Sequence, residues 1–180
     1  MKITALDIPD ILVIEPAVIE DDRGSFFESF NHRAFATFLN QDTRFVQDNQ
    51  SFSRKGVLRG LHYQLPPFAQ GKLVRVLSGE VLDVSVDIRR SSPTFGKWVG
   101  VVLSAQNRKQ LWIPPGFAHG FLTLSNTSEF AYKVSEYYKP EFERTIAWND
   151  PELAIDWQVE PVLSEKDLRG LSLADAEIYD

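Results

Sequence analysis

The chain has 180 residues, of which 43% are hydrophobic and 24% are charged, and its formal net charge is -6 at pH 7. This length is typical of one domain, and this composition excludes disordered and fibrous proteins. The negative net charge argues against binding nucleic acid or an anionic membrane through a bulk positive field. We therefore expect a single globular domain over residues 1–180, with no nucleic-acid partner and no membrane partner.

The cysteine count and the N-terminal sequence narrow the class further. The chain contains no cysteine, which excludes disulfides, thiolate catalysis and zinc sites with cysteine ligands. Residues 1–10 lack the apolar run of roughly 7 or more residues that a signal peptide needs, and no stretch approaches the roughly 18 apolar residues of a membrane span. We expect a soluble protein located in the cytoplasm.

Short β-strands dominate the predicted secondary structure. In chain order, the predicted strands cover residues 11–19, 25–30, 44–52, 57–64, 72–77, 82–88, 97–103, 110–113, 119–124, 129–138 and 145–148. Turn residues separate them. About ten short strands without alternating long helices favour an all-β sandwich or barrel over a parallel α/β sheet.

Residues 82–88 give the clearest strand signal, because apolar and polar side chains alternate there without a break. A period of two predicts a half-buried antiparallel strand. Ser78 and Gly79 separate this run from the preceding strand, and a two-residue loop containing glycine predicts a hairpin. The following Arg89 and Arg90 are interpreted as solvated turn charges.

Only short helices are predicted. Asn31 is a suitable N-cap for a short helix that places Phe35 and Leu39 on one face, and Ser164 begins a C-terminal helical segment over about 164–180. The proline-containing segment 149–163 is expected to wrap around the domain rather than to act as a linker.

Three strand-like segments, 57–64, 113–121 and 129–138, place polar side chains within otherwise apolar sequence. Strict alternation would put Arg59 and His62 on opposite faces of the first strand. Gly60 lies between them and predicts a bulge that redirects its neighbours. These segments are therefore the candidate places for chemistry.

Several sequence strings carry a family resemblance. The spacing of Pro114, Gly116 and His119 resembles the second signature of the cupin (jelly-roll) superfamily. More specific strings resemble the dTDP-4-dehydrorhamnose 3,5-epimerase family: Val-Leu-Arg-Gly-Leu-His (57–62), Gln-Gly-Lys-Leu-Val-Arg (70–75), Ser-Pro-Thr-Phe-Gly (92–96), Gln-Leu-Trp-Ile-Pro (110–114), Gly-Phe-Ala-His-Gly-Phe (116–121) and Trp-Asn-Asp-Pro (148–151). The resemblance runs from about residue 8 to about residue 168. It implies a cupin-like jelly-roll β-sandwich with short peripheral helices.

The resemblance also implies a function. Such an epimerase inverts carbons 3 and 5 of dTDP-4-dehydro-6-deoxy-D-glucose to give dTDP-4-dehydro-L-rhamnose, in dTDP-L-rhamnose or related deoxysugar biosynthesis. By resemblance, His62 is the base, Asp167 orients it, Tyr132 is the acid and Lys72 stabilises the enolate. No metal or other cofactor is implied.

The remaining implied ligand contacts are Arg23, Glu28, Gln47, Asn49, Arg59, His119, Glu143 and Lys166, with Tyr138 stacking on thymine. The resemblance further implies a homodimer that exchanges N-terminal strands, so that Arg23 and Glu28 reach the partner's site.

The chemistry of these residue types agrees with the implied roles. Inverting a carbon beside a ketone requires a base, a separate acid and a group that stabilises the enolate oxygen. An imidazole, a phenol and an ammonium supply these three functions. In an acidic protein the diphosphate of the substrate must be held locally, and the planar guanidinium of Arg23 or Arg59 can bind two phosphate oxygens at once.

Several alternatives stay open at this point. His62 could be a core histidine, and Asp167 could only cap the helix that begins at Ser164. A relative that inverts only carbon 3 or carbon 5 would carry similar residues. A metal-dependent cupin is a more distant alternative, because Gln64 stands where such proteins have a second histidine ligand. A further alternative is a module that binds the sugar nucleotide without catalysing a reaction.

Overall fold

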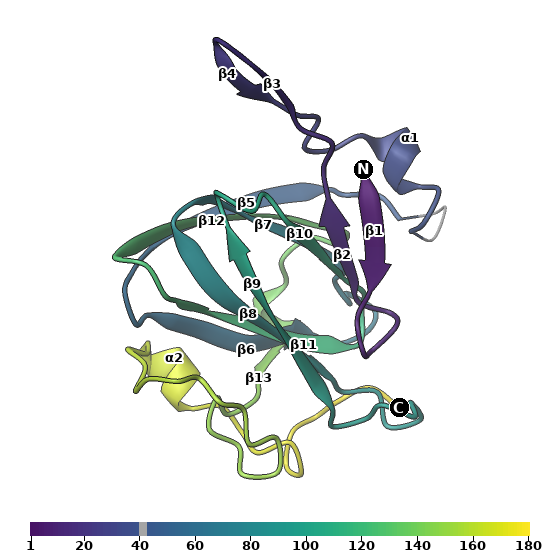
Figure 1. Cartoon of the computed structure of the whole chain (residues 1–180). Helices are drawn as coiled ribbons and strands as arrows, with labels where there is room; N and C mark the ends of the chain where they lie inside the picture. Colours follow the sequence, from purple (N-terminus) through teal and green to yellow (C-terminus); the bar gives the residue numbers. More distant parts are fainter. Residues whose placement is uncertain (40–42) are drawn as a thin grey trace.

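Two antiparallel sheets face each other in the computed structural model, which describes residues 1–39 and 43–180 (Figure 1). The six-stranded sheet has the order β1 (Lys2–Ala5), β2 (Leu12–Glu15), β10 (Gln110–Ile113), β7 (Lys72–Ser78), β12 (Thr127–Val134), β5 (Gln47–Arg54). The five-stranded sheet has the order β13 (Glu143–Thr145), β6 (Leu58–Gln64), β11 (Phe117–Thr123), β8 (Glu80–Asp87), β9 (Trp98–Ser104). The predicted all-β sandwich is therefore confirmed.

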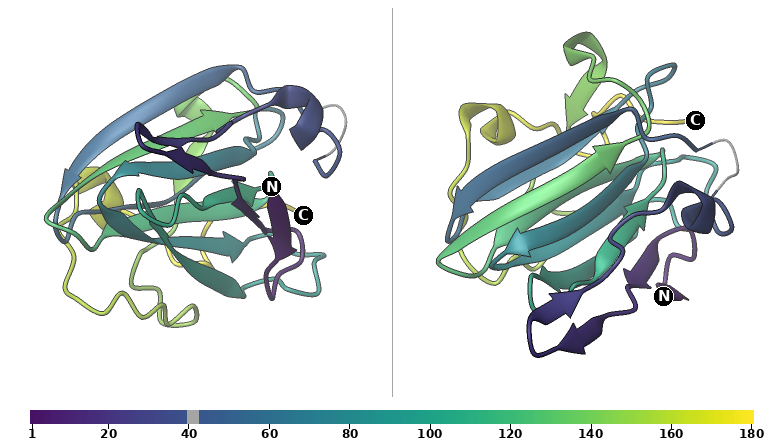
Figure 2. Two further views of the ribbon diagram at one scale, coloured as in Figure 1. Left: turned by 45° about the horizontal axis from the view of Figure 1, so that its top comes forward. Right: turned by 90° about the horizontal axis from the view of Figure 1, so that it is seen from above.

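A separate two-stranded hairpin projects from this body. Its strands are β3 (Ile19–Asp21) and β4 (Gly24–Phe26), and they pair only with each other within the described residues. The hairpin stands apart from the two sheets in Figure 1, and the right view of Figure 2 places it at the edge of the sandwich. The predicted strand over 11–19 is thus two strands, β2 and β3, joined by an extended connection.

The helices are short, as predicted. The side chain of Asn31 accepts a hydrogen bond from the Ala34 amide and caps α1 (His32–Phe35), and Ser164 caps α2 (Glu165–Leu168). A 3-10 turn, η1, covers Pro140–Phe142. The helix after Ser164 is shorter than the predicted 164–180, because the chain leaves α2 to pack Gly170 against the backbone of Ala147. No helix in residues 1–39 and 43–180 is long and apolar enough to cross a membrane.

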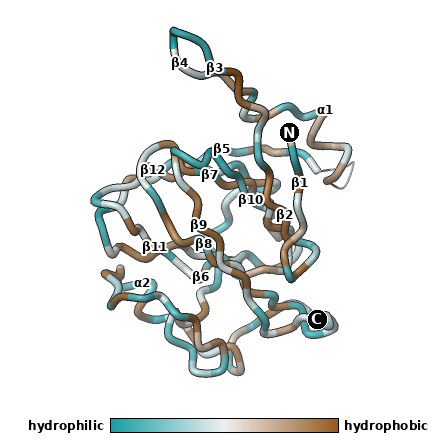
Figure 3. The backbone as a smooth tube through the Cα atoms, viewed as in Figure 1, coloured by the Kyte–Doolittle hydropathy of each residue, from teal (hydrophilic) through white to brown (hydrophobic). Residues whose placement is uncertain are grey.

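Buried hydrophobic residues form three clusters, of which the smallest packs α1 against the six-stranded sheet. One cluster lies between the sheets and includes Val74, Leu111 and Phe130. A second cluster lies on the outer face of the five-stranded sheet, where Trp157 and Leu173 pack from the C-terminal part of the chain. Figure 3 shows hydrophobic stretches along β2 and β9, whereas the tip of the β3–β4 hairpin is hydrophilic. Segment 149–163 contributes Trp157 to this second cluster, which agrees with its predicted wrapping role.

Strand β8 is buried on both faces, so the prediction of a half-buried strand at 82–88 is wrong. Val84 and Val86 face the C-terminal cover, while Asp83, Ser85 and Asp87 alternate with them on the opposite face, and all five are 0% exposed. The alternation therefore directs the polar side chains toward the space between the sheets, and the apolar side chains toward the C-terminal segment that covers the outer face of the sheet. The C-terminal segment that covers the outer face lies far away in sequence, so a local pattern could not indicate it.

The predicted hairpin at Ser78 and Gly79 is also wrong, since β7 and β8 belong to different sheets. Gly79 turns the chain from one sheet to the other with a φ of 79°, in the left-handed region that favours glycine. A Cβ at this position would lie 2.1 Å from the carbonyl oxygen of Thr127, so no larger residue fits. Strand β8 pairs instead with β9 and β11.

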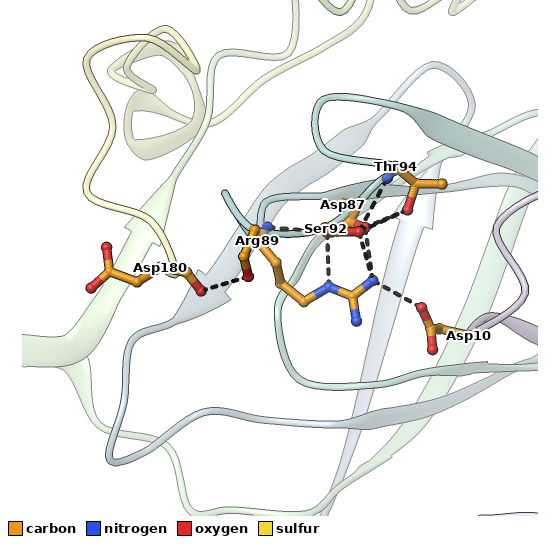
Figure 4. Close-up of polar contacts among 7 residues, drawn as sticks. Asp10, Asp87, Arg89, Ser92, Thr94 and Asp180 are labelled. Carbon is orange, nitrogen blue, oxygen red and sulfur yellow. Dashed lines mark hydrogen bonds and ion pairs between the residues drawn. The ribbon is translucent and has the colours of Figure 1, made fainter.

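A hydrogen-bonded network closes the end of β8 (Figure 4). The Asp87 carboxylate accepts five hydrogen bonds, three from Arg89, one from Ser92 and one from Thr94. Arg89 also donates to Asp10 at 2.9 Å and lies over the ring of Phe117. The interpretation of Arg89 as a solvated turn charge is therefore wrong, because its guanidinium neutralises a buried carboxylate.

Candidate active site

A cavity of about 420 Å³ lies between the two sheets. Of the thirteen residues predicted to form the site, eleven line it: Gln47, Asn49, Arg59, His62, Lys72, His119, Tyr132, Tyr138, Glu143, Lys166 and Asp167. These residues come from both sheets and from the C-terminal segment. The fold thus brings together side chains that lie more than 100 residues apart in sequence, as the His62 to Asp167 hydrogen bond illustrates.

A bulge in β6 directs two of these side chains into the cavity. The register between β6 and β11 shifts at Gly60, which has a φ of 139°. A Cβ on Gly60 would lie 2.4 Å from the Cα of Gly120, so the two strands approach too closely for a side chain. The predicted bulge is confirmed, and both Arg59 and His62 line the cavity. Arg59 is held by a 3.0 Å hydrogen bond from Nε to the Ser53 hydroxyl.

His62 is paired with a buried carboxylate. Its Nε2 lies 2.6 Å from Oδ1 of Asp167, whose side chain is 4% exposed. The Ser164 hydroxyl donates to the other carboxylate oxygen at 2.6 Å. Burial would raise the pKa of Asp167, but the hydrogen bonds from His62 and Ser164 outweigh it and lower this pKa. The carboxylate is therefore ionised and fixes the proton of His62 on Nε2, which leaves Nδ1 as the basic atom.

This geometry bears on the two alternatives for Asp167. The helix cap is the side chain of Ser164, which accepts a hydrogen bond from the Asp167 amide at 3.2 Å. Of the Asp167 carboxylate, Oδ2 accepts from the Ser164 hydroxyl, whereas Oδ1 lies 2.6 Å from Nε2 of His62 and accepts a long 3.4 Å hydrogen bond from the Gly60 amide. One turn of helix thus holds the carboxylate against the histidine.

Lys72 is a buried cation that lines the cavity. Its ammonium donates to the backbone carbonyl of His62 at 3.0 Å, and the residue is only 7% exposed. Burial lowers the pKa of Lys72 to about 8, although the carboxylates of Glu143 and Asp83 oppose this shift. An ammonium group near this pKa is charged at neutral pH and retains donors that can bind an anionic oxygen.

Two tyrosines and an ion pair complete the cavity. Burial raises the pKa of Tyr132, with a further contribution from Glu143, so its phenol stays protonated. Tyr138 is about half exposed and donates to Glu143 at 2.8 Å. Glu143 also pairs with Lys166 at 2.6 Å. Gln47 accepts a hydrogen bond from the Tyr138 amide and so ties this tyrosine to the edge strand β5.

His119 has a carboxylate partner that the sequence analysis did not identify. Its Nε2 lies 2.9 Å from Oδ2 of Asp83, and both residues are buried. His119 stands directly opposite His62 in the β6–β11 ladder. The alternation over 82–88 puts Asp83 on the polar face of its strand, and the half-buried interpretation assigned that face to solvent, whereas Asp83 is 0% exposed. Ser164, which orients Asp167, was noticed only as a helix cap.

Arg23 and Glu28 do not line the cavity of their own chain. Arg23 lies in the β3–β4 hairpin, its side chain is 90% exposed and it pairs with Asp21. Glu28 follows the hairpin and accepts a hydrogen bond from Asn31 at 3.1 Å. The structure therefore places these two predicted contacts away from the other eleven.

No group of three or more His, Cys, Asp or Glu side chains is placed to hold a metal ion in the part of the chain that the structure describes. Each cavity histidine is bound to its own carboxylate. Gln64, at the position of a second cupin histidine, donates to the Phe68 carbonyl and accepts from the Lys139 amide. The absence of a metal or other cofactor stays a prediction.

Comparison with known proteins identifies the family. The model of the family described as dTDP-4-dehydrorhamnose 3,5-epimerase matches residues 5–175. The chain belongs to this family. A dTDP-4-dehydrorhamnose 3,5-epimerase from Pseudomonas aeruginosa is 59% identical to the chain over 99% of both sequences. The resemblance stated from the sequence motifs is therefore confirmed.

Solved structures of family members share the fold. A dTDP-6-deoxy-D-glucose-3,5-epimerase from Legionella pneumophila, in complex with dTDP-4-keto-L-rhamnose, is 52% identical with a TM-score of 0.94, covering 98% of this chain and 94% of that one. A 3'-monoepimerase from Streptomyces bikiniensis, in complex with dTDP-quinovose, is 35% identical with a TM-score of 0.89, covering 94% and 87%. The fold thus serves single and double epimerases, and the higher identity lies with the double ones. The predicted isomerase, a dTDP-4-dehydrorhamnose 3,5-epimerase, is confirmed.

Proposed function

We propose that this epimerase binds a dTDP-linked 4-keto-6-deoxyhexose in the cavity between its sheets and inverts carbons 3 and 5 through an enolate. His62 is the base, Tyr132 is the acid, Lys72 stabilises the enolate and Asp167 orients the base. The observation that carries these roles is the 2.6 Å contact of His62 with a buried carboxylate, in the same cavity as the phenol of Tyr132.

The positions of the base and the acid suit an inversion. His62 belongs to β6 of the five-stranded sheet, and Tyr132 belongs to β12 of the six-stranded sheet. A sugar ring held between the sheets has one of these groups on each face. His62 removes the proton from the carbon beside the ketone on one face, and the phenol of Tyr132 delivers a proton to the same carbon from the other.

Each proton transfer creates a charge that a neighbouring residue must stabilise. When His62 Nδ1 takes the proton, the ring becomes an imidazolium that the Asp167 carboxylate stabilises, and negative charge moves to the enolate oxygen. The ammonium of Lys72 can bind that oxygen. Tyr132 becomes a phenolate after it donates, so both side chains must exchange protons with solvent before the second carbon reacts. A positioned acid or base contributes roughly 10²- to 10⁴-fold to such a rate.

The mouth of the cavity suits the nucleotide. The half-exposed ring of Tyr138 offers a face for thymine, and stacking of a base on an aromatic ring contributes about 1–3 kcal/mol. Arg59 and Lys166 line the same cavity and supply positive charge. Local cations are necessary because the net charge of -6 repels a diphosphate.

Proton exchange into the substrate tests this proposal. The enzyme and the 4-keto sugar nucleotide are incubated in deuterated water, with and without a strong chelator, and followed by proton NMR. We expect the signals of the protons on carbons 3 and 5 to disappear, with or without the chelator. Loss at one carbon would indicate a mono-epimerase, loss at neither a binding module, and sensitivity to chelator a metal-dependent cupin.

Substitutions test the assigned roles. We expect His62→Ala to reduce exchange at both carbons by roughly 10²-fold or more, because the base is lost. Tyr132→Phe should still allow proton removal but impair inversion. His32→Ala is the matched control, since this histidine is exposed on α1 and does not line the cavity. Exchange by His62→Ala at the wild-type rate would remove the base role.

We further infer that the enzyme is a homodimer whose N-terminal strands exchange, so that Arg23 and Glu28 enter the partner's site. The hairpin that carries Arg23 leaves Ile19 65% exposed and Phe26 70% exposed, and such apolar side chains favour burial against another copy. The hairpin contacts neither sheet through strand pairing within the described residues. The cytoplasmic location stays a prediction.

A complementation assay tests the exchange. Arg23→Ala and His62→Ala proteins are mixed, dissociated and reassociated. In a mixed dimer, one site would combine the intact His62 of one protomer with the intact Arg23 of the other, so activity should return above that of either variant alone. Unchanged low activity, or sedimentation as a monomer, would contradict the exchanged dimer.

A further inference from the structure

The second histidine of the cavity is also held by a carboxylate. Nε2 of His119 lies 2.9 Å from Oδ2 of Asp83, which is 0% exposed. The other carboxylate oxygen, Oδ1, is buried and has no hydrogen-bond partner among residues 1–39 and 43–180. Burying an ionised carboxylate with so few hydrogen bonds is unfavourable for folding. This cost points to a role of Asp83 in the site beside it.

The surroundings of His119 fix its chemical state. Burial lowers the pKa of the imidazole, and Lys72 and His62 act in the same direction, while Asp83 opposes them. The ring is therefore neutral at neutral pH and carries one proton. Because a carboxylate only accepts hydrogen bonds, that proton lies on Nε2, between the ring and Asp83.

The other ring nitrogen faces a different task. His119 lines the cavity, and its Nδ1 makes no hydrogen bond to any described residue. In the Nε2–H tautomer this atom carries a lone pair and can only accept. His119 is 7% exposed, compared with 25% for the side chain of His62, so only one edge of its ring can meet a ligand. A hydroxyl group is the substrate group that donates to such an atom.

We propose that Asp83 is a positioning residue that locks His119 in the Nε2–H tautomer, so that Nδ1 accepts a hydrogen bond from a hydroxyl of the bound sugar. The choice of a sugar as ligand rests on the function proposed above. The tautomer itself does not, because it is set in the free enzyme by Asp83. The two cavity histidines would then share one design with different carboxylates, Asp167 from α2 and Asp83 from β8.

The first test measures the tautomer without any substrate. The chain has three histidines, so the ring nitrogens can be assigned by nitrogen-15 NMR with the aid of His32→Gln and His62→Gln variants. We expect the wild-type His119 ring to be protonated at Nε2 and bare at Nδ1 near neutral pH. A wild-type ring protonated at Nδ1 would overturn the proposal.

The second test removes the carboxylate. Asp83→Leu has a similar size and no acceptor, so the His119 ring should become a mixture of tautomers, and kcat/KM should fall roughly 10- to 100-fold, as expected for the loss of a hydrogen bond to a charged group. Asp83→Asn retains one acceptor oxygen and should keep the Nε2–H tautomer and more of the activity. An unchanged tautomer or unchanged kcat/KM in folded Asp83→Leu would contradict the positioning role.

A matched control separates positioning from stability. Asp87→Asn removes another fully buried carboxylate from the same strand, four residues away. It should lower the melting temperature but leave the His119 tautomer and the kcat/KM of the folded protein unchanged. An equal shift of the His119 signals in this control would show that any damage to β8 moves the ring, and would overturn the specific role of Asp83. A wild-type enzyme without carbon–hydrogen exchange would overturn the proposed function but leave the tautomer of His119 and its control by Asp83 to be decided by the first two tests.

Discussion

Strand β8 carries two buried carboxylates that lie in opposite surroundings. Asp87, at its end, accepts five hydrogen bonds from Arg89, Ser92 and Thr94. Asp83, in its middle, has a single partner, His119, and one oxygen without any among the described residues. A carboxylate whose bonding capacity is filled by the protein stabilises the fold. One whose partners are titratable groups beside a cavity is available to control a ligand.

The closed end of β8 ties distant parts of the chain together. Arg89 joins Asp87 to Asp10 near the N-terminus (Figure 4). The Ser91 hydroxyl contacts the backbone oxygen of Asp180 at 3.5 Å. Burial would raise the pKa of Asp87, but the hydrogen bonds from its neighbours lower it to about 2. The cavity has the reverse character, since burial there dominates and lowers the pKa of Lys72, on β7, to about 8. Substitutions at the end of β8 are thus expected to affect mainly stability, and substitutions in the cavity mainly catalysis.

The largest effect is expected from a carboxylate of the cavity. Asp167→Asn should reduce the exchange rate by roughly 10²-fold or more, because the imidazolium loses its anion, while the free energy of unfolding changes by only about 1 kcal/mol. Deuterium exchange and urea denaturation measure the two quantities. Glu165→Gln, an exposed neighbour on α2, is the control. A large loss of stability with intact exchange would contradict the distinction between the cavity and the end of β8.

The closed end should respond in the opposite way. Asp87→Asn should lower the free energy of unfolding by about 3 kcal/mol, because it leaves the guanidinium of Arg89 without its charge partner. Exchange per folded molecule should not change. Urea denaturation checks the first expectation, and kinetics well below the midpoint check the second. A tenfold slower exchange in the folded variant would refute the structural role.

The same network predicts an acid dependence of stability. The pKa of Asp87 is about 2 in the folded protein and about 3.9 in an unfolded chain. Its contribution is therefore complete above about pH 4 and is lost as the pH falls through about 2. Denaturation curves between these values should show a weaker pH dependence for Asp87→Asn than for the wild type. Identical slopes would show that other carboxylates account for the acid sensitivity.

Alkaline pH should lower the reaction rate through Lys72 in the cavity. Because the pKa of Lys72 is about 8, the ammonium loses its proton as the pH rises through that value, and the rate should fall about tenfold for each further pH unit. The phenol of Tyr138 is not expected to interfere, since its hydrogen bond to Glu143 raises its pKa to about 12. A pH–rate profile measures this fall in rate at high pH. Its persistence in Lys72→Met would assign it to another group.

The smallest effect is expected at the mouth. Tyr138→Phe keeps the ring for stacking and loses only the hydrogen bond to Glu143, so KM should rise about two- to fivefold with little change in kcat. Tyr137→Phe alters the neighbouring exposed tyrosine and serves as the control. A strong loss of kcat in Tyr138→Phe would place its hydroxyl in the chemistry instead.

Local sequence signals predicted the parts of the site that depend on local structure. Gly60 indicated the bulge that brings Arg59 and His62 into one cavity, and Asn31 and Ser164 were recognised as helix starts because capping depends on neighbouring residues. The family motifs supplied eleven residues that line the cavity. These predictions required no knowledge of what covers each strand.

The errors arose where a distant segment decides the outcome. Alternation in 82–88 defines which side chains share a face, but the C-terminal cover makes the polar face the inner one, so Asp83 was missed. Gly79 indicated a turn, yet the pairing of β8 with β11 rather than β7 depends on contacts between distant strands. Arg89 looked like a surface charge because its partner Asp87 was assigned to solvent.

The C-terminal cover has a consequence for how the enzyme is made. Residues after 146 hide the apolar outer face of β8, including Val84 and Val86, and they also deliver Asp167 to His62. On a ribosome, where synthesis proceeds from the N-terminus, the five-stranded sheet emerges well before its cover. A nascent chain therefore covers the apolar face of this sheet and positions its catalytic base only after the C-terminal residues have been synthesised. An incompletely translated product would expose that apolar face and lack activity.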